Sequence, residues 1–155
     1  MRAIVAIDEQ WGIGKEGKLL FTIPEDMKHF KDITINHIVV MGSNTFESLP
    51  GMKALPSREN IVLSSIKEYQ NVINIKNFKA SLDYLRDIPG EEIYIIGGGK
   101  VYLQFLPFVN KVKAIYHANT FFPNLDEKEE WKCISQSEWK ESGGYQYCFC
   151  VYKKY

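Results

Sequence analysis

The feature that most constrains the fold of this chain is an alternation of short apolar runs with helical segments. The apolar runs are rich in Ile and Val and occupy residues 2–7, 37–41, 60–64, 71–75, 92–96 and 111–118. The segments with helical signals occupy residues 22–33, 43–48, 78–86 and 100–106. Strands that alternate with helices in this way form a mainly parallel α/β sheet.

The C-terminal part of the chain has a different pattern. Two strand-like stretches, 131–134 and 145–152, flank a Gly143-Gly144 turn, which indicates an antiparallel edge to the sheet. With 155 residues the chain has the length of one domain. We therefore predict a single α/β domain over 1–155, with a mainly parallel eight-stranded sheet, an antiparallel C-terminal strand and about four flanking helices.

Composition excludes several classes of function. Lys plus Arg and Asp plus Glu each number 19, so the net charge is zero, which argues against non-specific binding to nucleic acid or membranes. The three cysteines suit free thiols in a reducing cytoplasm. We predict no metal site, because Cys148 and Cys150 have no further Cys or His at ligand spacing. The apolar N-terminal run is too short for a signal peptide or a membrane span, so a cytoplasmic protein is expected.

Parallel sheets bind ligands outside the carboxyl ends of their strands. The loop over 8–22 leaves the first strand at that edge, and its length is typical of a functional lid. The turns after Met41, Ser64 and Ile96 meet at the same edge. These segments are therefore expected to carry the binding residues.

The most distinctive of these turns is Gly97-Gly98-Gly99, which joins a strand to a helix. Glycines allow the backbone to approach a phosphate closely, and the helix start offers free N–H groups. Val101 after Lys100 excludes a Walker A loop, and Tyr102 interrupts a full GxGxxG pattern. From the residues alone, a pyrophosphate site and an ordinary tight turn are equally supported. The related turn at Gly42 is better explained, on its own, as a capped helix.

Two charged residues have both a structural and a functional interpretation. Asp26 begins a helix whose apolar stripe we assign to Met27, Phe30 and Ile33. By pattern alone Asp26 is a solvent-exposed acid in a first turn, but on the inward face it would bind an N–C–N edge, with a raised pKa. Arg58 is either an ordinary surface arginine or a bidentate partner for a carboxylate.

Taken together and in order, these segments resemble the dihydrofolate reductase family over nearly the whole chain. The resemblance is carried by residues 12–14, 23–31, 41–49, 58–65, 96–102, 121–123 and 147–149. It implies NADPH-dependent reduction of dihydrofolate to tetrahydrofolate by hydride transfer to C6 and protonation at N5, which feeds one-carbon metabolism and thymidylate synthesis. It also implies binding of antifolate inhibitors.

The resemblance implies a role for individual residues. Asp26 would be the catalytic carboxylate, holding the pterin and promoting protonation. The residues implied to bind substrate are Ile4, Ala6, Asp26, Met27, Phe30, Lys31, Leu49, Leu55, Arg58 and Ile96. The residues implied to bind NADPH are Ala6, Ile13, Leu19, Gly42, Asn44, Thr45, Ser64, Ser65, Gly97, Gly98, Gly99, Lys100, Val101 and Tyr102.

Several positions depart from the family pattern. Phe21 stands where the family usually has Trp, and no Thr lies near 114–117 to contact the acid. Ser43 and Asn44 replace residues that are often basic and contact the 2′-phosphate, a role that Lys67 or Lys100 would take over. We hypothesise that these changes weaken antifolate binding.

Two other functions remain open at this point. One is a pteridine or pyrimidine reductase of the same fold, such as the reductase of riboflavin synthesis, although such an enzyme has no need of Arg58. The other is a non-catalytic nucleotide-binding module, which has no need of Asp26. A monomer is expected, because no coiled-coil heptad or exposed apolar helix is evident.

Overall fold

The computed structural model describes residues 1–14, 23–114 and 122–155. The strands are β1 Arg2–Ile4, β2 Ile38–Gly42, β3 Glu59–Leu63, β4 Ile73–Ile75, β5 Ile93–Gly97, β6 Lys111–Ala114, β7 Trp131–Gln136, β8 Lys140–Ser142, β9 Tyr145–Tyr147 and β10 Cys150–Lys154. The helices are α1 Pro24–Thr34, α2 Ser43–Ser48, α3 Phe78–Leu85 and α4 Gly99–Phe105, with 3-10 turns at Pro50–Met52, Gly90–Glu92 and Leu106–Phe108.

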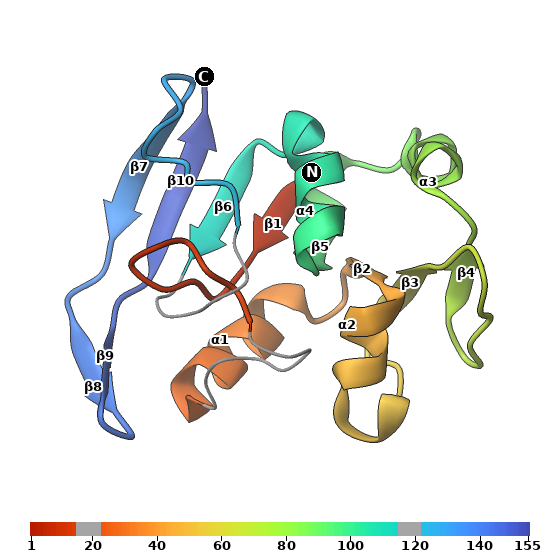
Figure 1. The fold of residues 1–155 in the computed structure, drawn as a ribbon, viewed down its shortest axis with the longest axis horizontal. Helices are drawn as coiled ribbons and strands as arrows, with labels where there is room; N and C mark the ends of the chain where they lie inside the picture. The colour runs from red at the N-terminus through yellow and green to blue at the C-terminus, as the bar shows by residue number, and fades with distance from the viewer. Residues whose placement is uncertain (15–22, 115–121) are drawn as a thin grey trace.

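The main sheet has eight strands in the order β4-β3-β2-β5-β1-β6-β10-β7 (Figure 1). Each neighbouring pair from β4 through to β6 is parallel, whereas β10 runs antiparallel to both β6 and β7. The predicted fold class is therefore confirmed. Because β1 and β2 both lie beside β5, the ends of these three strands are brought together at the sheet edge where ligands bind.

The predicted strand over 145–152 is wrong in one respect, since it is two strands. β9 pairs with β8 in a separate hairpin, and β10 joins the main sheet. The physical reason lies in burial: Tyr147 and Cys148 are adjacent yet both buried, so the alternation of a single strand is broken between the two sheets. The predicted glycine turn is present, and Gly143 and Gly144 have φ of 60° and 82°.

Both faces of the sheet are covered by apolar side chains, as expected for parallel strands. Along β2, Val40 packs into one core, and its neighbours Val39 and Met41 pack into the other. Helices α3 and α4 contribute Leu85 and Phe105 to the first core. Helices α1 and α2 cover the opposite face, and Figure 1 shows the two helix pairs on either side of the sheet.

Helix α1 begins at Pro24, within the segment 22–33 that the sequence predicts to be helical. Its N-cap is Ile23, which offers no side-chain acceptor, and Thr22 lies outside the described residues. Pro24 occupies the first turn, where its missing N–H costs no helical hydrogen bond. In the described part of the chain, none of the helices has the length and apolar character needed to cross a lipid bilayer.

Candidate functional site

The carboxyl ends of β1, β2 and β5 and the start of α4 form one edge of the site. The Tyr102 hydroxyl on α4 donates a 2.7 Å hydrogen bond to the Ile4 carbonyl at the end of β1. Gly42 at the end of β2 faces Val101, and a Cβ on Gly42 would lie 3.1 Å from the Val101 side chain. The sequence therefore places α4 directly against the ends of two central strands.

Asp26 lies on α1 beside this edge. Its side chain is half-buried, and burial raises its pKa from 3.8 to about 6. Within the described residues no side chain donates a hydrogen bond to this carboxylate, so its negative charge is left uncompensated there. A buried carboxylate of this kind is suited to a ligand that brings its own N–H donors.

Two buried tyrosines lie close enough to Asp26 to feel its charge. Burial raises the pKa of Tyr102, and the Asp26 carboxylate raises it further. The pKa of Tyr147 on β9 is also raised, by burial and by Glu25 and Asp26. Asp26 therefore faces both the central strands and the C-terminal hairpin.

A row of half-buried apolar side chains extends from Asp26 along the α1 face of the sheet. The members of this row that pack on the second core are Phe30, Ile33, Leu49, Leu55 and Ile96. Asp26, Phe30 and Ile33 are spaced by four and three residues, so they share one face of α1. The predicted stripe is thus correct for Phe30 and Ile33 and wrong for Met27, whose side chain in the first turn of α1 is 52% exposed.

Arg58 stands at the far end of this row. Its guanidinium donates to Thr34 Oγ1 at 3.0 Å and to the Pro56 carbonyl at 3.0 Å, and lies 5.9 Å from the centre of the Phe30 ring. No described acid pairs with it, and burial lowers its pKa. The loop before it is fixed by buried Asn60, which bonds to the Leu55 backbone in both directions at 2.9 Å. Arg58 is therefore a preorganised cation without a carboxylate partner in the described part of the chain.

The glycine turn after β5 is packed against α2. Gly97 has a φ of 128°, a region that favours glycine, and a Cβ there would lie 3.4 Å from the Thr45 hydroxyl. A Cβ on Gly98 would lie 3.3 Å from the same hydroxyl. A side chain at Gly97 or Gly98 would therefore crowd the Thr45 hydroxyl, and glycine lets the turn lie close against α2.

A cavity of about 490 Å³ continues from this turn between α2, α4 and the segment after β3. It is lined by hydroxyl, amide, apolar and lysine side chains: Ser43, Asn44, Leu63, Ser64, Ser65, Ile66, Lys67, Lys76, Asn77, Phe78, Lys100, Val101 and Gln104. Three of these are lysines, and none of these lining residues is an acid. The donor set fits a phosphorylated nucleoside.

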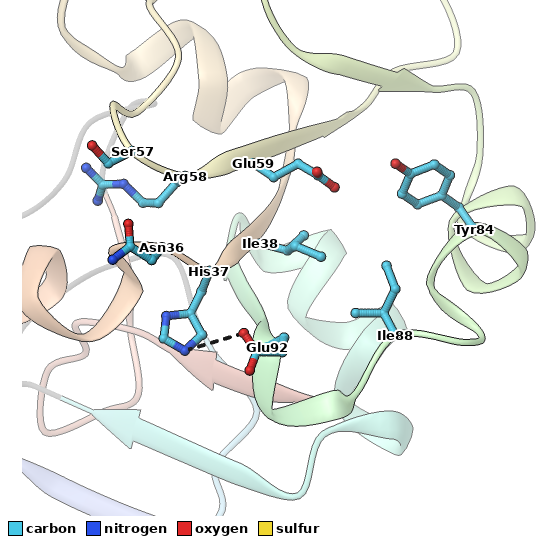
Figure 2. A pocket seen from close by; sticks show the side chains of 9 residues that line it. All are labelled: Asn36, His37, Ile38, Ser57, Arg58, Glu59, Tyr84, Ile88 and Glu92. Atoms are coloured by element: carbon cyan, nitrogen blue, oxygen red, sulfur yellow. Dashed lines mark ion pairs between the residues drawn. The ribbon is translucent and has the colours of Figure 1, made fainter.

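A second cavity, of about 510 Å³, lies at the opposite edge of the sheet (Figure 2). It meets the amino ends of β2, β3 and β5 and contains both acids and bases. His37 Nε2 lies 3.9 Å from a Glu92 oxygen, and Glu59 hydrogen-bonds to Tyr84. Arg58 also borders this cavity. Its mixed charge gives no preference for an anion, in contrast to the lysine-lined cavity.

Most of the predicted site residues lie along these surfaces. Ala6 and Ile13 are half-buried beside the site, and Lys31 is exposed on α1. Leu19, Leu20, Phe21 and the positions 115–121 lie outside the described residues. The residues that sequence reasoning missed are Thr34, Tyr147, Lys76 and Gln104. Only Thr34, a polar residue in an apolar face of α1, left a signal in the sequence.

Comparison with known proteins shows what this chain resembles. The family model described as dihydrofolate reductase matches residues 1–154. The dihydrofolate reductase of Bacillus subtilis (strain 168) is 34% identical over 160 residues, which cover 97% of this chain and 92% of that protein. The dihydrofolate reductase of Haemophilus influenzae is 36% identical over 126 residues, covering 77% of this chain and 76% of that protein.

A solved structure also matches. It is a dihydrofolate reductase from Enterococcus faecalis complexed with NADP(H) and RAB-propyl, with a TM-score of 0.84 and 31% sequence identity. The match covers 99% of this chain and 95% of that chain.

Proposed function

Since the chain belongs to the dihydrofolate reductase family, we propose that the row beside Asp26 holds dihydrofolate and that the glycine turn with its lysine-lined cavity holds NADPH. The chain is an NADPH-dependent oxidoreductase that reduces dihydrofolate to tetrahydrofolate. The family membership favours this reaction over the two other functions considered from the sequence, a riboflavin-type reductase and a non-catalytic nucleotide-binding module. The observation that carries the site assignment is the half-buried Asp26 carboxylate, with no donor among the described residues and a pKa of about 6.

In this proposal the pterin lies against α1, with its N3 and 2-amino group on Asp26. Ile4, Ala6, Phe30 and Ile96 line the ring, and Leu49 and Leu55 contact the benzoyl group. The exposed Met27 covers the ligand from the mouth of the row. Arg58 pairs with the α-carboxylate of the glutamate tail, since it is half-buried, fixed by Thr34 and has no acid partner among residues 1–14, 23–114 and 122–155. Lys31 lies near the same tail.

The proposed cofactor site continues from the pterin along the sheet edge. Gly97, Gly98 and Gly99 hold the pyrophosphate with Gly42 and Thr45, since Gly97 and Gly98 lie so close to the Thr45 hydroxyl that a Cβ at either would crowd it. Lys100, Val101 and Tyr102 extend this wall. Asn44, Ser64 and Ser65 contact the adenosine side in the lysine-lined cavity. Ile13 borders the nicotinamide end, together with Leu19 of the lid loop.

The chain's own contribution to catalysis is placement and charge. The bound dihydronicotinamide supplies the hydride to C6 of the pterin. The strand ends and α4 hold donor and acceptor in contact and exclude water. Asp26 fixes the pterin tautomer and favours protonation at N5, and the proton itself arrives through water. Tyr102 holds the Ile4 carbonyl at the end of β1 and so keeps the floor of the site in place.

The proposal extends to the state of the protein in the cell. We place it in the cytoplasm as a monomer of one domain, binding dihydrofolate and antifolate inhibitors but not nucleic acid or membranes. Its three cysteines are free thiols, which suits a reducing compartment.

Binding of two ligands tests the site assignment. Wild type is expected to quench NADPH fluorescence and to bind methotrexate, whose diaminopteridine ring brings N–H donors to Asp26. Asp26→Asn is expected to keep NADPH binding and to lose at least about tenfold in methotrexate affinity, since a charge-assisted contact is removed. The matched control is Asp32→Asn, an exposed acid of the same helix, which should bind both ligands as wild type does. Equal methotrexate affinity in Asp26→Asn and wild type would refute the role of Asp26.

A further inference from the structure

The hydroxyl of Tyr147 is a polar group to which the proposed reaction gives no role. Tyr147 is the last residue of β9 and is only 2% exposed. Tyrosine hydroxyls in protein interiors usually have a hydrogen-bond partner. In the described part of the chain, however, no residue forms a hydrogen bond with this hydroxyl. Tyr147 therefore presents a donor that its folded surroundings leave unused.

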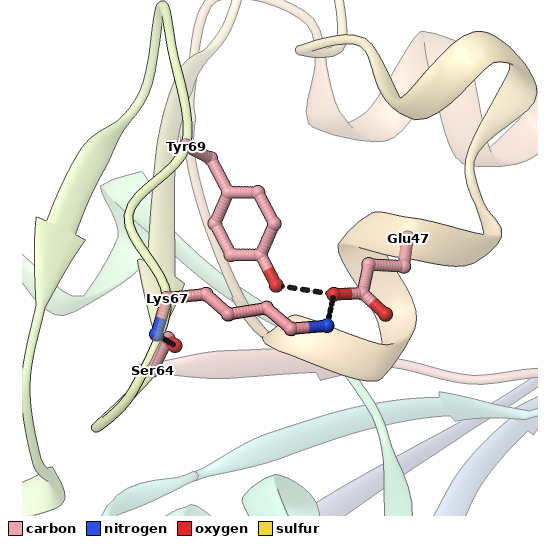
Figure 3. Close-up of polar contacts among 4 residues, drawn as sticks. All are labelled: Glu47, Ser64, Lys67 and Tyr69. Atoms are coloured by element: carbon pink, nitrogen blue, oxygen red, sulfur yellow. Dashed lines mark hydrogen bonds and ion pairs between the residues drawn. The ribbon is translucent and has the colours of Figure 1, made fainter.

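The hydroxyls of the other buried tyrosines in the described ranges are all engaged. Their partners are Arg2 for Tyr94, the Ile4 carbonyl for Tyr102 and Asp126 for Tyr152. The half-buried Tyr69 shows how a tyrosine beside an acid is used in this fold, since its hydroxyl donates to Glu47 at 2.6 Å (Figure 3). Tyr147 thus differs from its counterparts in having no such bond to a described residue.

Packing places Tyr147 at the start of α1. Its ring packs with Ile23, the N-cap of α1, and with Ala6 after β1. The ring of Phe149 meets that of Tyr147 edge-on, with 5.6 Å between the ring centres. Phe149 in turn lies 4.1 Å from the ring centre of His29 in the second turn of α1. The end of the β8–β9 hairpin is therefore held against the first two turns of α1.

The first turn of α1 carries two acids, Glu25 and Asp26. The charges of both raise the pKa of Tyr147, so both carboxylates lie within electrostatic reach of it. Glu25 is exposed and is solvated by bulk water, whereas Asp26 is half-buried and loses part of its hydration on folding. A donor supplied by the protein therefore matters more to Asp26 than to Glu25.

Tyr147 and Asp26 form no direct hydrogen bond, so the link between them requires a bridging water. A water that accepts from the hydroxyl and donates to the carboxylate satisfies both groups, and such bridges are nearly as favourable as direct hydrogen bonds. We propose that Tyr147 is a positioning residue for the proton step: its hydroxyl holds a water molecule against the Asp26 carboxylate. This inference rests on the proposed role of Asp26 and adds the residue that fixes its water.

The effect of this contact on Asp26 can be measured. A hydrogen bond donated to a carboxylate favours its ionised form. Tyr147→Phe keeps the ring and its packing but removes the donor, so the pKa of Asp26 is expected to rise by about 0.5 to 1 pH unit, the effect of one net hydrogen bond. The inflection of kcat/KM for dihydrofolate should move upward by the same amount.

Other ionisable groups in this region must be separated from Asp26. They are Glu25 and His29 on α1, Tyr102 on α4 and Lys140 on β8. Histidine ordinarily titrates near neutral pH, so the enzymatic inflection alone does not identify its owner. The Asp26 carboxyl is therefore followed directly by ¹³C NMR on the ligand-free full chain, as the aspartate signal that is missing in Asp26→Asn.

Tyr69→Phe is the matched control, because it removes a tyrosine hydroxyl from beside an acid outside the proposed pterin site. It should leave the titration of Asp26 unchanged. In an Asp26→Asn background, Tyr147→Phe should cause no further change in the pH profile.

Two results would overturn the proposal. One is an Asp26 titration that is the same in Tyr147→Phe and in wild type. The other is a loss of kcat/KM in Tyr147→Phe that is equal at every pH and equally large in the Asp26→Asn background, since that pattern indicates a purely structural role.

The same measurements distinguish failure of this inference from failure of the proposed function. Wild type that does not reduce dihydrofolate, with the Asp26 titration still shifted in Tyr147→Phe, would overturn the reaction and its proton step but not the link between the two residues. Wild type that reduces dihydrofolate, with no shift in Tyr147→Phe, would overturn the role of Tyr147 alone.

Discussion

Replacing Asp26 by asparagine measures how much the buried, ionised carboxylate lowers the free energy of unfolding. Burial raises the pKa of Asp26 from 3.8 to about 6, so the folded protein binds this proton more tightly than the unfolded chain does. Ionisation of Asp26 therefore destabilises the fold. The loss begins as pH rises above the unfolded value and is complete above about pH 6.

The size of the effect follows from the shift. At about pH 8 the ionised carboxylate costs about 3 kcal/mol of unfolding free energy, whereas at about pH 4 it costs about 0.5 kcal/mol. Asparagine carries no charge at either pH. Asp26→Asn is therefore expected to be more stable than wild type, by a margin that grows between these two conditions, while its catalytic activity falls. A gain in stability with a loss of function is typical of a change at an active site.

Urea unfolding of both proteins across this pH range is the assay. Asp32→Asn provides a control of opposite sign, because hydrogen bonding to Lys28 lowers the pKa of Asp32. Asp32 contributes stability above its unfolded pKa, so this variant should be less stable than wild type near neutral pH and equal to it in acid. An Asp26→Asn margin that is independent of pH, or that shrinks as pH rises, would refute the reasoning about burial.

Three further predictions follow from the same site. In wild type, kcat/KM for dihydrofolate should fall as pH rises through about 6, since reduction consumes a proton, and the inflection should be missing in Asp26→Asn; a persistent inflection would assign it to another group. Arg58→Leu should raise the KM for dihydrofolate about tenfold and leave the KM for a dihydropterin without the glutamate tail unchanged, whereas equal effects on both would contradict the proposed pairing. Gly97→Ala and Gly144→Ala each place a side chain at positive φ and should each lose about 1–3 kcal/mol in urea unfolding, but only Gly97→Ala should also weaken NADPH binding in a fluorescence titration.

The sequence was sufficient to predict the sheet because its signals were local and mutually consistent. β2 and β5 are short apolar runs ended by glycine, and both were located to within a residue or two. Where the local signal changed, the prediction failed. The stretch 145–152 reads as one apolar strand, but pairing with β8 on one side and with β6 on the other divides it, and such pairing is not encoded in the residues themselves.

The candidate site could be predicted from the order and spacing of several motifs along the chain, but not from the residue pattern of any single segment. Asp26 on pattern alone suited a solvent-exposed first-turn acid, and its burial depends on how α1 packs on the sheet. The assignment of Met27 to the inward face was wrong. Helical periodicity favours an apolar residue such as Met27 on the buried face over the neighbouring charged residue Asp26. Asp26, Phe30 and Ile33 form the actual inward face, so the helical stripe contains the carboxylate that the cleft presents to its ligand.

The remaining site residues depend on contacts between segments far apart in the chain. Thr34 supports Arg58 across 24 residues, and Glu47 reaches Lys67 across 20. Tyr147 enters the neighbourhood of Asp26 only because the C-terminal hairpin folds back onto it. Single-sequence periodicity contains no information about such pairs, which is why they became visible only in the folded structure.

Oxidation of NADPH, followed by its near-ultraviolet absorbance in the presence and absence of dihydrofolate, tests the proposed reaction. Wild type is expected to oxidise NADPH only when dihydrofolate is present, with tetrahydrofolate formed in equal amount, and Asp26→Asn is expected to be much slower near neutral pH. Turnover that survives the substitution would retain the enzyme but contradict the role of Asp26. Wild type that oxidises no NADPH with dihydrofolate would contradict the account as a whole.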